Sequence, residues 1–257
     1  MPALAAGDPR MTEPDLPASP EASVWLELNG EPFVTWLCTP ARLEELACGW
    51  LLGEGLIGDR RDVVELNARE EERCVRARIV GDVEPERRGG RRTVTRMLES
   101  GPGVAAFTLE RIPRSEARPL PERGAAIRDG RLRDWFQEMY RRCPIRTEGR
   151  GIHSGALVSG DSVLHVMEDV GRHNVVDKVC GAALLAGTPL EGSLVLLSGR
   201  ISAEIAVKAW RARLGGIATL SIPTSLARSI AERAGITLVG RSLTGSPFVY
   251  EPGAGKP

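Results

Sequence analysis

The sequence predicts an α/β protein, with a mainly parallel sheet and flanking helices in its C-terminal half and a smaller α+β part before it. After Gly151, short apolar runs alternate with stretches of helical periodicity, which is typical of strands joined by helices. Before residue 84, pairs of alternating apolar and polar runs flank a single helical segment. Between the two parts, glycine and proline interrupt every periodic pattern.

These patterns divide the chain into five segments. They are a disordered N-terminal segment (1–22), the α+β part (23–83), a flexible linker (84–131), an α/β domain that carries the candidate binding site (132–250) and a disordered tail (251–257). The α+β part is expected to hold a hairpin (24–28 and 33–37), a helix from Pro40 to Gly53 or Gly55, and strands at 63–66 and 74–80. The α/β domain is expected to hold helices at 132–140, 175–185, 203–214 and 226–234, and strands at 164–167, 194–197, 217–220, 236–239 and 248–250.

Composition limits the class of protein. The 257 residues carry 34 Lys and Arg against 34 Asp and Glu, and this balance disfavours binding to nucleic acid through bulk charge. No apolar run approaches the roughly 18 residues that a membrane helix needs, and prolines break the first twenty residues, unlike a signal peptide. We therefore expect a cytoplasmic protein that binds neither nucleic acid nor membranes.

The five cysteines are widely spaced and odd in number, which does not suit a disulfide framework. Free thiols are expected. They are Cys38, Cys48, Cys74, Cys143 and Cys180. Cys48 and Cys180 fall on apolar faces of predicted helices and are expected in the core.

The densest polar cluster is Glu168–Asn174, which follows one predicted strand and opens a helix. Asn174 is expected to be the N-cap, with Asp177 completing a box-like arrangement. Arg172 and His173 then lie at a helix N-terminus, where free backbone N–H groups favour an anion. An ordinary capped turn whose acids pair with the arginine explains the cluster equally well.

Two further turns have the same construction. Ser198-Gly199-Arg200 lies between a strand and a helix capped by Ser202, and Thr224 or Ser225 caps the next helix. Glu204 and Lys208 are four residues apart, so a surface salt bridge is the simpler interpretation of that pair. Because strand-to-helix turns of parallel strands meet at one sheet edge, we expect a shared phosphate-binding rim. Its residues are Arg172, His173, Arg200 and Thr224.

Glu168 to Lys178 reads EDVGRHNVVDK and closely resembles the EDVGRHNAxDK signature of the FdhD/NarQ family of formate dehydrogenase accessory sulfurtransferases. Ser198-Gly199-Arg200, Pro223-Thr224-Ser225 and Gly235–Gly240 add to the resemblance in order, and it spans about residues 23–250. It implies a cytidine-deaminase-like fold and a homodimer. It also implies transfer of sulfur from a cysteine desulfurase to the molybdenum bis(molybdopterin guanine dinucleotide) cofactor, for delivery to formate dehydrogenase.

The resemblance and the rim together select the candidate cofactor-binding residues. They are His153, Glu168, Asp169, Arg172, His173, Arg200, Lys208, Thr224, Arg241, Ser242, Leu243, Thr244, Gly245 and Ser246. His153, Glu168 and Asp169 are expected to support the rim. No resident metal is expected, because the HxE and PCxxC zinc ligands of deaminases are absent.

Three departures from the family pattern concern chemistry. Ser100–Gly103 stands where the family carries Cys-Gly-x-Cys, and neither serine nor glycine forms a persulfide. Gly149–His153 replaces Thr-Gly-Gly-x-His but keeps the histidine, and Gly240–Leu243 replaces Gly-Phe-x-Arg.

Cys143 is the candidate substitute for the missing thiols, because the neighbouring Arg141 and Arg142 are expected to lower its pKa. The alternative is a partly buried, inert cysteine. If no thiol substitutes, the chain is a cofactor-binding chaperone or a regulator that has lost sulfur transfer.

Overall fold

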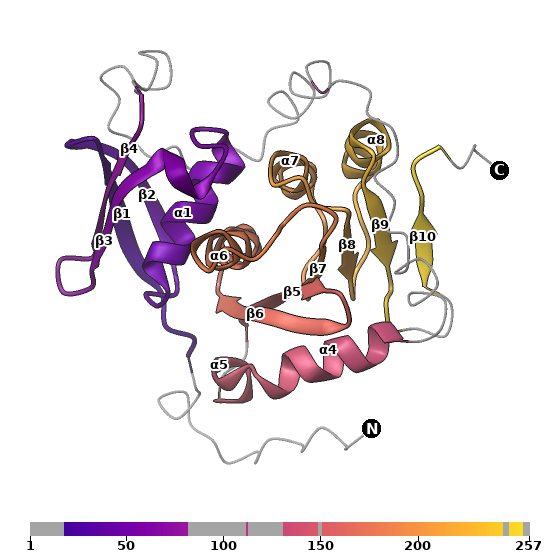
Figure 1. Cartoon of the computed structure of the whole chain (residues 1–257). Helices are drawn as coiled ribbons and strands as arrows, with labels where there is room; N and C mark the ends of the chain where they lie inside the picture. Colours follow the sequence, from indigo (N-terminus) through magenta and orange to yellow (C-terminus); the bar gives the residue numbers. More distant parts are fainter. Residues whose placement is uncertain (1–17, 82–111, 113–130, 149–150, 244–246, 254–257) are drawn as a thin grey trace, which may run out of the picture.

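The structure is a computed structural model that describes residues 18–81, 112, 131–148, 151–243 and 247–253. This part of the chain forms two sheets, with α1 (Leu43–Glu54) and α6 (Arg172–Leu185) packed between them (Figure 1). Most of the predicted N-terminal segment, almost all of the predicted linker and the end of the predicted tail lie outside the described residues. None of the helices in the described ranges is both long and apolar enough to cross a bilayer.

The smaller sheet has the order β2-β1-β4-β3. Its strands are β1 (Ala22–Leu28), β2 (Glu31–Cys38), β3 (Val63–Arg69), which follows the short helix η2 (Arg60–Asp62), and β4 (Cys74–Ile79). The predicted hairpin is confirmed, since β1 and β2 pair antiparallel. The predicted start of α1 at Pro40 is wrong: Arg42 takes a left-handed conformation with φ of 59°, and the helix begins at Leu43. Gly55 ends it with φ of 70°.

The larger sheet has the order β10-β9-β8-β7-β5-β6. Its strands are β5 (His153–Ser159), β6 (Ser162–Asp169), β7 (Leu194–Leu197), β8 (Gly216–Thr219), β9 (Thr237–Gly240) and β10 (Phe248–Tyr250). Pairing is parallel for β7–β8 and β8–β9 and antiparallel for the other three pairs, so the prediction of a mainly parallel sheet is wrong. The cause is β5, which the sequence analysis missed and which joins β6 through a tight turn at Gly160, where φ is 58°.

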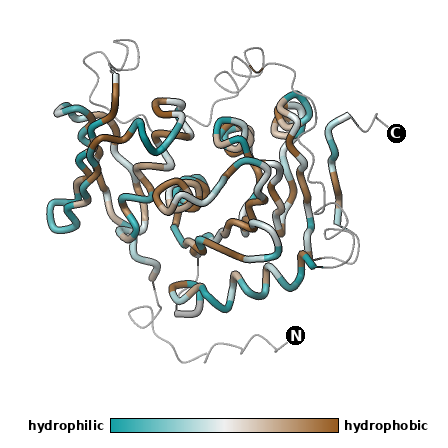
Figure 2. The backbone as a smooth tube through the Cα atoms, in the orientation of Figure 1, coloured by the Kyte–Doolittle hydropathy of each residue, from teal (hydrophilic) through white to brown (hydrophobic). Residues whose placement is uncertain are grey.

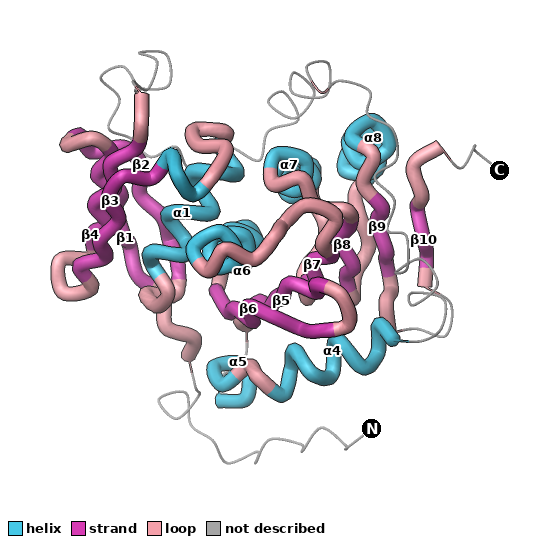
Figure 3. Tube along the Cα trace, in the orientation of Figure 1, coloured by secondary structure: helices cyan, strands magenta, loops and turns pink. Residues whose placement is uncertain are grey.

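Helices cover both faces of this sheet (Figure 3). The helices α6, α7 (Ala203–Arg211) and α8 (Ser225–Ala234) pack on one face, and α4 (Arg131–Arg141) packs on the other. The short α5 (Pro144–Glu148) joins α4 to β5. Every residue of the central strands β7, β8 and β9 is buried, and most are apolar, as expected for strands covered on both faces (Figure 2).

The strand directions bring the polar turns to one edge despite the antiparallel pairs. Because β5 runs antiparallel to both β6 and β7, those two strands run in the same direction. The carboxyl ends of β6, β7, β8 and β9 therefore lie at one edge, together with His153 at the start of β5. We call this edge, with the turns that follow these four strands, the rim.

Two glycines allow α1 and α6 to cross in backbone contact. A Cβ atom added to Gly49 would lie 1.8 Å from the carbonyl oxygen of Asp177, and one added to Gly181 would lie 1.9 Å from that of Glu45. No side chain fits at either position without separating the helices. This crossing joins the smaller sheet to the helix that begins at the rim.

We expect Gly49→Ala to destabilise the protein by about 1–3 kcal/mol or more, because the added methyl group forces the two helices apart. Thermal unfolding of the full chain measures this. Gly58→Ala is the matched control, since a Cβ there meets no atom closer than 3.7 Å. Equal melting temperatures for the two variants would show that the helix crossing is not close-packed.

Candidate functional site

Three elements of the rim meet at Gly199, in the turn after β7. A Cβ added there would lie 3.1 Å from Nδ1 of His153 and 3.2 Å from Cβ of Arg172. The start of β5, the start of α6 and the turn after β7 are therefore in direct contact. The sequence expectation that Arg172 and the Arg200 turn share one edge is confirmed by this geometry.

Thr219, which the sequence analysis did not single out, connects the other turns of the rim. It is the buried last residue of β8, and its Oγ1 donates to the carbonyl oxygen of Gly199 at 2.5 Å. Oγ1 of Thr219 also accepts from the N–H of Ser221 at 3.1 Å. The carbonyl oxygen of Thr219 accepts from Oγ of Ser242 at 2.8 Å and from its N–H at 3.0 Å. One residue, through its side chain and its carbonyl oxygen, thus connects the turns after β7, β8 and β9.

The rim carries two arginines with unused donors. Nε of Arg172 is buried and has no hydrogen-bond partner among the described residues. Arg200 is exposed and makes no hydrogen bond or ion pair with any described residue. Thr224 is the N-cap of α8, as predicted, and its side chain accepts from the N–H of Ala227. The exposed guanidinium of Arg200 and the start of α6 can both donate to an anion.

His153 lies between positive charges. Burial lowers the pKa of its imidazole, and Arg172 and Arg146 lower it further, whereas Asp169 opposes them. Arg146, on α5, was not among the predicted site residues. The sequence signal that could have found it is its place seven residues before the histidine, in the connection that leads to the rim. Arg146 thus adds positive charge near His153, and its Cζ lies 4.3 Å from the ring centroid of Tyr140.

His173 connects the starts of α6 and α7. Its Nε2 lies 2.9 Å from Oγ of Ser202, the N-cap of α7, and 3.1 Å from Oε2 of Glu204. Burial and the charges of Arg172 and Lys208 lower the pKa of His173 to about 3, and burial raises the pKa of Glu204. The imidazole is therefore neutral at pH 7, and its contact with Glu204 is not an ion pair.

Several signature residues lie beneath the rim rather than on it. Asp169 is fully buried, 2.6 Å from Nζ of Lys178, and it accepts from the N–H of Gly171 at 2.8 Å. Asn174 is not the predicted N-cap: α6 begins at Arg172 with Gly171 as N-cap, and the amide of Asn174 donates to Asp169 and to the carbonyl oxygen of Leu37. These contacts attach β2 of the smaller sheet to the start of α6.

Lys208 is also buried. Its Nζ lies 2.7 and 2.8 Å from the two carboxylate oxygens of Asp177, and the predicted surface pair with Glu204 is not formed. Glu168 accepts from the N–H groups of Ile145 and Arg146 at 3.0 and 2.7 Å, so it holds the start of α5. The structure thus gives Asp169, Lys208 and Glu168 partners within the protein.

The predicted loop 241–246 is described only in part. Arg241 has φ of 53°, and its guanidinium lies over the ring of Phe248, with Cζ 5.3 Å from the ring centroid. Ser242 is buried against Thr219, and Leu243 is 37% exposed. Thr244, Gly245 and Ser246 lie outside the described residues.

All five cysteines lie in the described residues, and all are buried. Burial raises the pKa of every one of these thiols, to about 11 for Cys143 and Cys48 and about 12 for Cys38 and Cys180. The predicted lowering of the Cys143 pKa is wrong, because burial outweighs the opposing charges of Arg146 and Arg142. The thiol of Cys143 donates to the carbonyl oxygen of Met139 at 3.1 Å.

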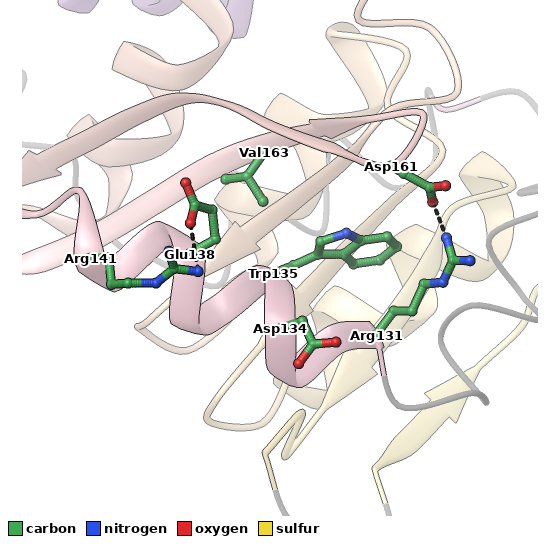
Figure 4. A pocket seen from close by; sticks show the side chains of 7 residues that line it. All are labelled: Arg131, Asp134, Trp135, Glu138, Arg141, Asp161 and Val163. Atoms are coloured by element: carbon green, nitrogen blue, oxygen red, sulfur yellow. Dashed lines mark hydrogen bonds and ion pairs between the residues drawn. The ribbon is translucent and has the colours of Figure 1, made fainter. Parts of the chain in front are cut away.

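A surface hollow lies beside α4 and the turn between β5 and β6, which is at the opposite end of these two strands from the rim. Figure 4 shows the side chains that line it. Its lining residues are Arg131, Asp134, Trp135, Glu138, Arg141, Asp161 and Val163. Arg131 pairs with Asp161, and Arg141 lies 2.7 Å from Glu138, so its charges are largely neutralised internally. This arrangement favours the rim as the functional site.

The model of the FdhD/NarQ family matches residues 19–254. The chain belongs to this family. It is 32% identical to the sulfur carrier protein FdhD of Shouchella clausii, covering 95% of this chain and 91% of that protein. It is 33% identical to the sulfur carrier protein FdhD of Cupriavidus necator, covering 93% and 83%.

A solved structure has a similar fold. It is the crystal structure of a protein described as a formate dehydrogenase accessory protein from Desulfotalea psychrophila, with a TM-score of 0.67 and 22% identity over 90% of this chain and 86% of that one. The similarity confirms the predicted α/β class. The likeness to cytidine deaminases stays a prediction.

We expect His173 to make the protein less stable in mild acid. Its folded pKa of about 3 lies below the unfolded value of 6.5, so the unfolded chain takes up a proton first as the pH falls, and stability decreases. Between pH 7 and pH 5 this contribution is about 2 kcal/mol. Denaturant unfolding of the parent and His173→Gln at both pH values measures it.

Comparing the two proteins separates the effect of His173 from that of Asp177. The pKa of Asp177 is raised to about 6, so its protonation makes the folded state more stable as the pH falls. The glutamine variant should lose less stability than the parent on acidification. Identical losses would mean that His173 is protonated in the folded protein.

Proposed function

We propose that this member of the FdhD/NarQ family binds a guanine-nucleotide-bearing molybdenum cofactor at the rim and serves the maturation of formate dehydrogenase without carrying sulfur on a thiol of its own. The cofactor is cargo in this proposal. The single observation that carries it is the contact of the Arg172, His153 and Gly199 elements at one sheet edge.

The charges of the rim support an anionic cargo. Arg172 and Arg200 bring two guanidinium groups to one edge, Arg146 adds positive charge near His153, and His153 and His173 are neutral. The starts of α6 and α8 add backbone N–H groups. A pyrophosphate fits this combination, and the bis(molybdopterin guanine dinucleotide) cofactor carries two of them.

The partners follow from the relatives. The solved relative is described as a formate dehydrogenase accessory protein, and the sequence relatives are named sulfur carrier proteins. We propose formate dehydrogenase as the client of this chain as well. The homodimer and the cysteine desulfurase remain predictions from the resemblance.

The thiols support the loss of sulfur transfer from this chain. A persulfide forms on an accessible thiolate, and burial with a raised pKa opposes both accessibility and ionisation. All five cysteines share these two properties. The sulfur that the family transfers would have to come to the bound cofactor from another protein.

We expect the chain to bind GDP, a fragment of the cofactor, and Arg172→Ala and Arg200→Ala each to weaken this binding about tenfold or more, because each removes a charged hydrogen-bond donor. Isothermal titration calorimetry measures the affinity. Arg78→Ala is the control, since Arg78 is exposed on the smaller sheet and lies 3.5 Å from Glu65. No binding at millimolar GDP, or equal affinities in all variants, contradicts the proposal.

We expect the chain to gain no sulfur when it is incubated with a cysteine desulfurase and cysteine, because no thiol is exposed. Intact-mass spectrometry detects the mass of an added sulfur atom, and the Cupriavidus necator relative serves as the positive control. An added sulfur that disappears in Cys143→Ser would instead identify Cys143 as a carrier.

A further inference from the structure

Phe248 is an exposed aromatic residue at the rim. Its side chain is 47% exposed although it belongs to a strand of the main sheet. It pairs with Gly240, the last residue of β9, so it lies at the same edge as the other rim residues. The ring is therefore accessible to a ligand bound at this edge.

The ring of Phe248 also points to the face of the sheet that α6, α7 and α8 cover. Tyr250, two residues along the same strand, packs with Leu238 in the core beneath α6, α7 and α8, and Arg228 of α8 lies over its ring at 4.2 Å. Since residues two apart in a strand point to the same face, Phe248 faces this side as well. Val249 points to the opposite face, where its partner Val239 packs in the core beneath α4.

The ring is already paired with a cation of the rim. Cζ of Arg241 lies 5.3 Å from the ring centroid, within the range of a cation–π contact. Exposed Ile222, in the turn after β8, lies close to Gly240, the residue that pairs with Phe248. A flat ring with a guanidinium and apolar neighbours has the chemistry of a base-stacking site.

We propose that Phe248 is the platform on which a base of the bound nucleotide stacks, while its phosphates lie toward Arg200 and Arg172. This inference rests on the proposed function and adds the position of the base. In the strand order, β10 is separated from β7 by three intervals of about 4.8 Å each, or roughly 14 Å in all. That span is comparable with the length of an extended nucleoside diphosphate.

The test compares GDP with inorganic pyrophosphate, which has no base. We expect Phe248→Ala to weaken GDP about tenfold, as expected for loss of one base–aromatic stack, and to leave pyrophosphate affinity unchanged. Phe248→Trp should restore GDP binding. Val249→Ala is the matched control, since Val249 is 37% exposed on the same strand but faces the other side.

The outcomes separate this inference from the proposed function. If the parent chain binds GDP and Phe248→Ala binds it equally well, the platform is wrong and the rim site stands. If the parent binds neither GDP nor pyrophosphate, both are wrong. A Phe248→Ala variant that keeps GDP affinity but changes from dimer to monomer in sedimentation would make the ring a contact between copies and overturn the inference.

Discussion

The rim depends on the packing of α6 between the two sheets. Two buried ion pairs, Asp169–Lys178 and Asp177–Lys208, and the glycine crossing with α1 fix this helix from both sides. Buried pairs of this kind contribute little net stability, but removing one partner leaves a charge without compensation, so alternative positions of the helix are costly. The first residues of α6 carry Arg172 and His173. Their placement at the sheet edge is therefore a consequence of packing that occurs beneath them.

Much of the fold could be predicted because its signals are local. The strands β7 and β10 have the predicted bounds, and Thr224 is a cap as expected. The strand β5 was missed because its apolar run is short and begins with Gly155, next to serines. Asn174 has the local features of an N-cap, yet its side-chain amide donates to the carbonyl oxygen of Leu37, which is 137 residues away in sequence. The residues around Asn174 in the sequence give no sign of that partner.

In the candidate site too, features set by neighbouring residues could be predicted, whereas features set by residues distant in sequence could not. The convergence of the turns was predicted from parallel strands, and it holds because the two antiparallel steps through β5 cancel. Lys208 was expected near the surface because its local neighbour is Glu204, whereas its partner Asp177 lies on another helix. For Cys143, sequence neighbours supplied charge, but only the fold supplies burial, and burial determines the direction of the pKa shift.

Most residues of the family signature therefore contribute to packing within the protein. Within Glu168–Lys178, the buried residues Asp169, Asn174, Asp177 and Lys178 bind other parts of the protein, and Arg172 and His173 reach the rim. A chain can keep such a signature as long as α6 keeps its place at the rim. Sulfur transfer also requires an accessible thiolate, and this packing does not supply one. Retention of the signature without Cys-Gly-x-Cys, at the position of Ser100–Gly103, is thus physically consistent with the proposed function, in which the rim binds the cargo and a partner supplies the sulfur chemistry.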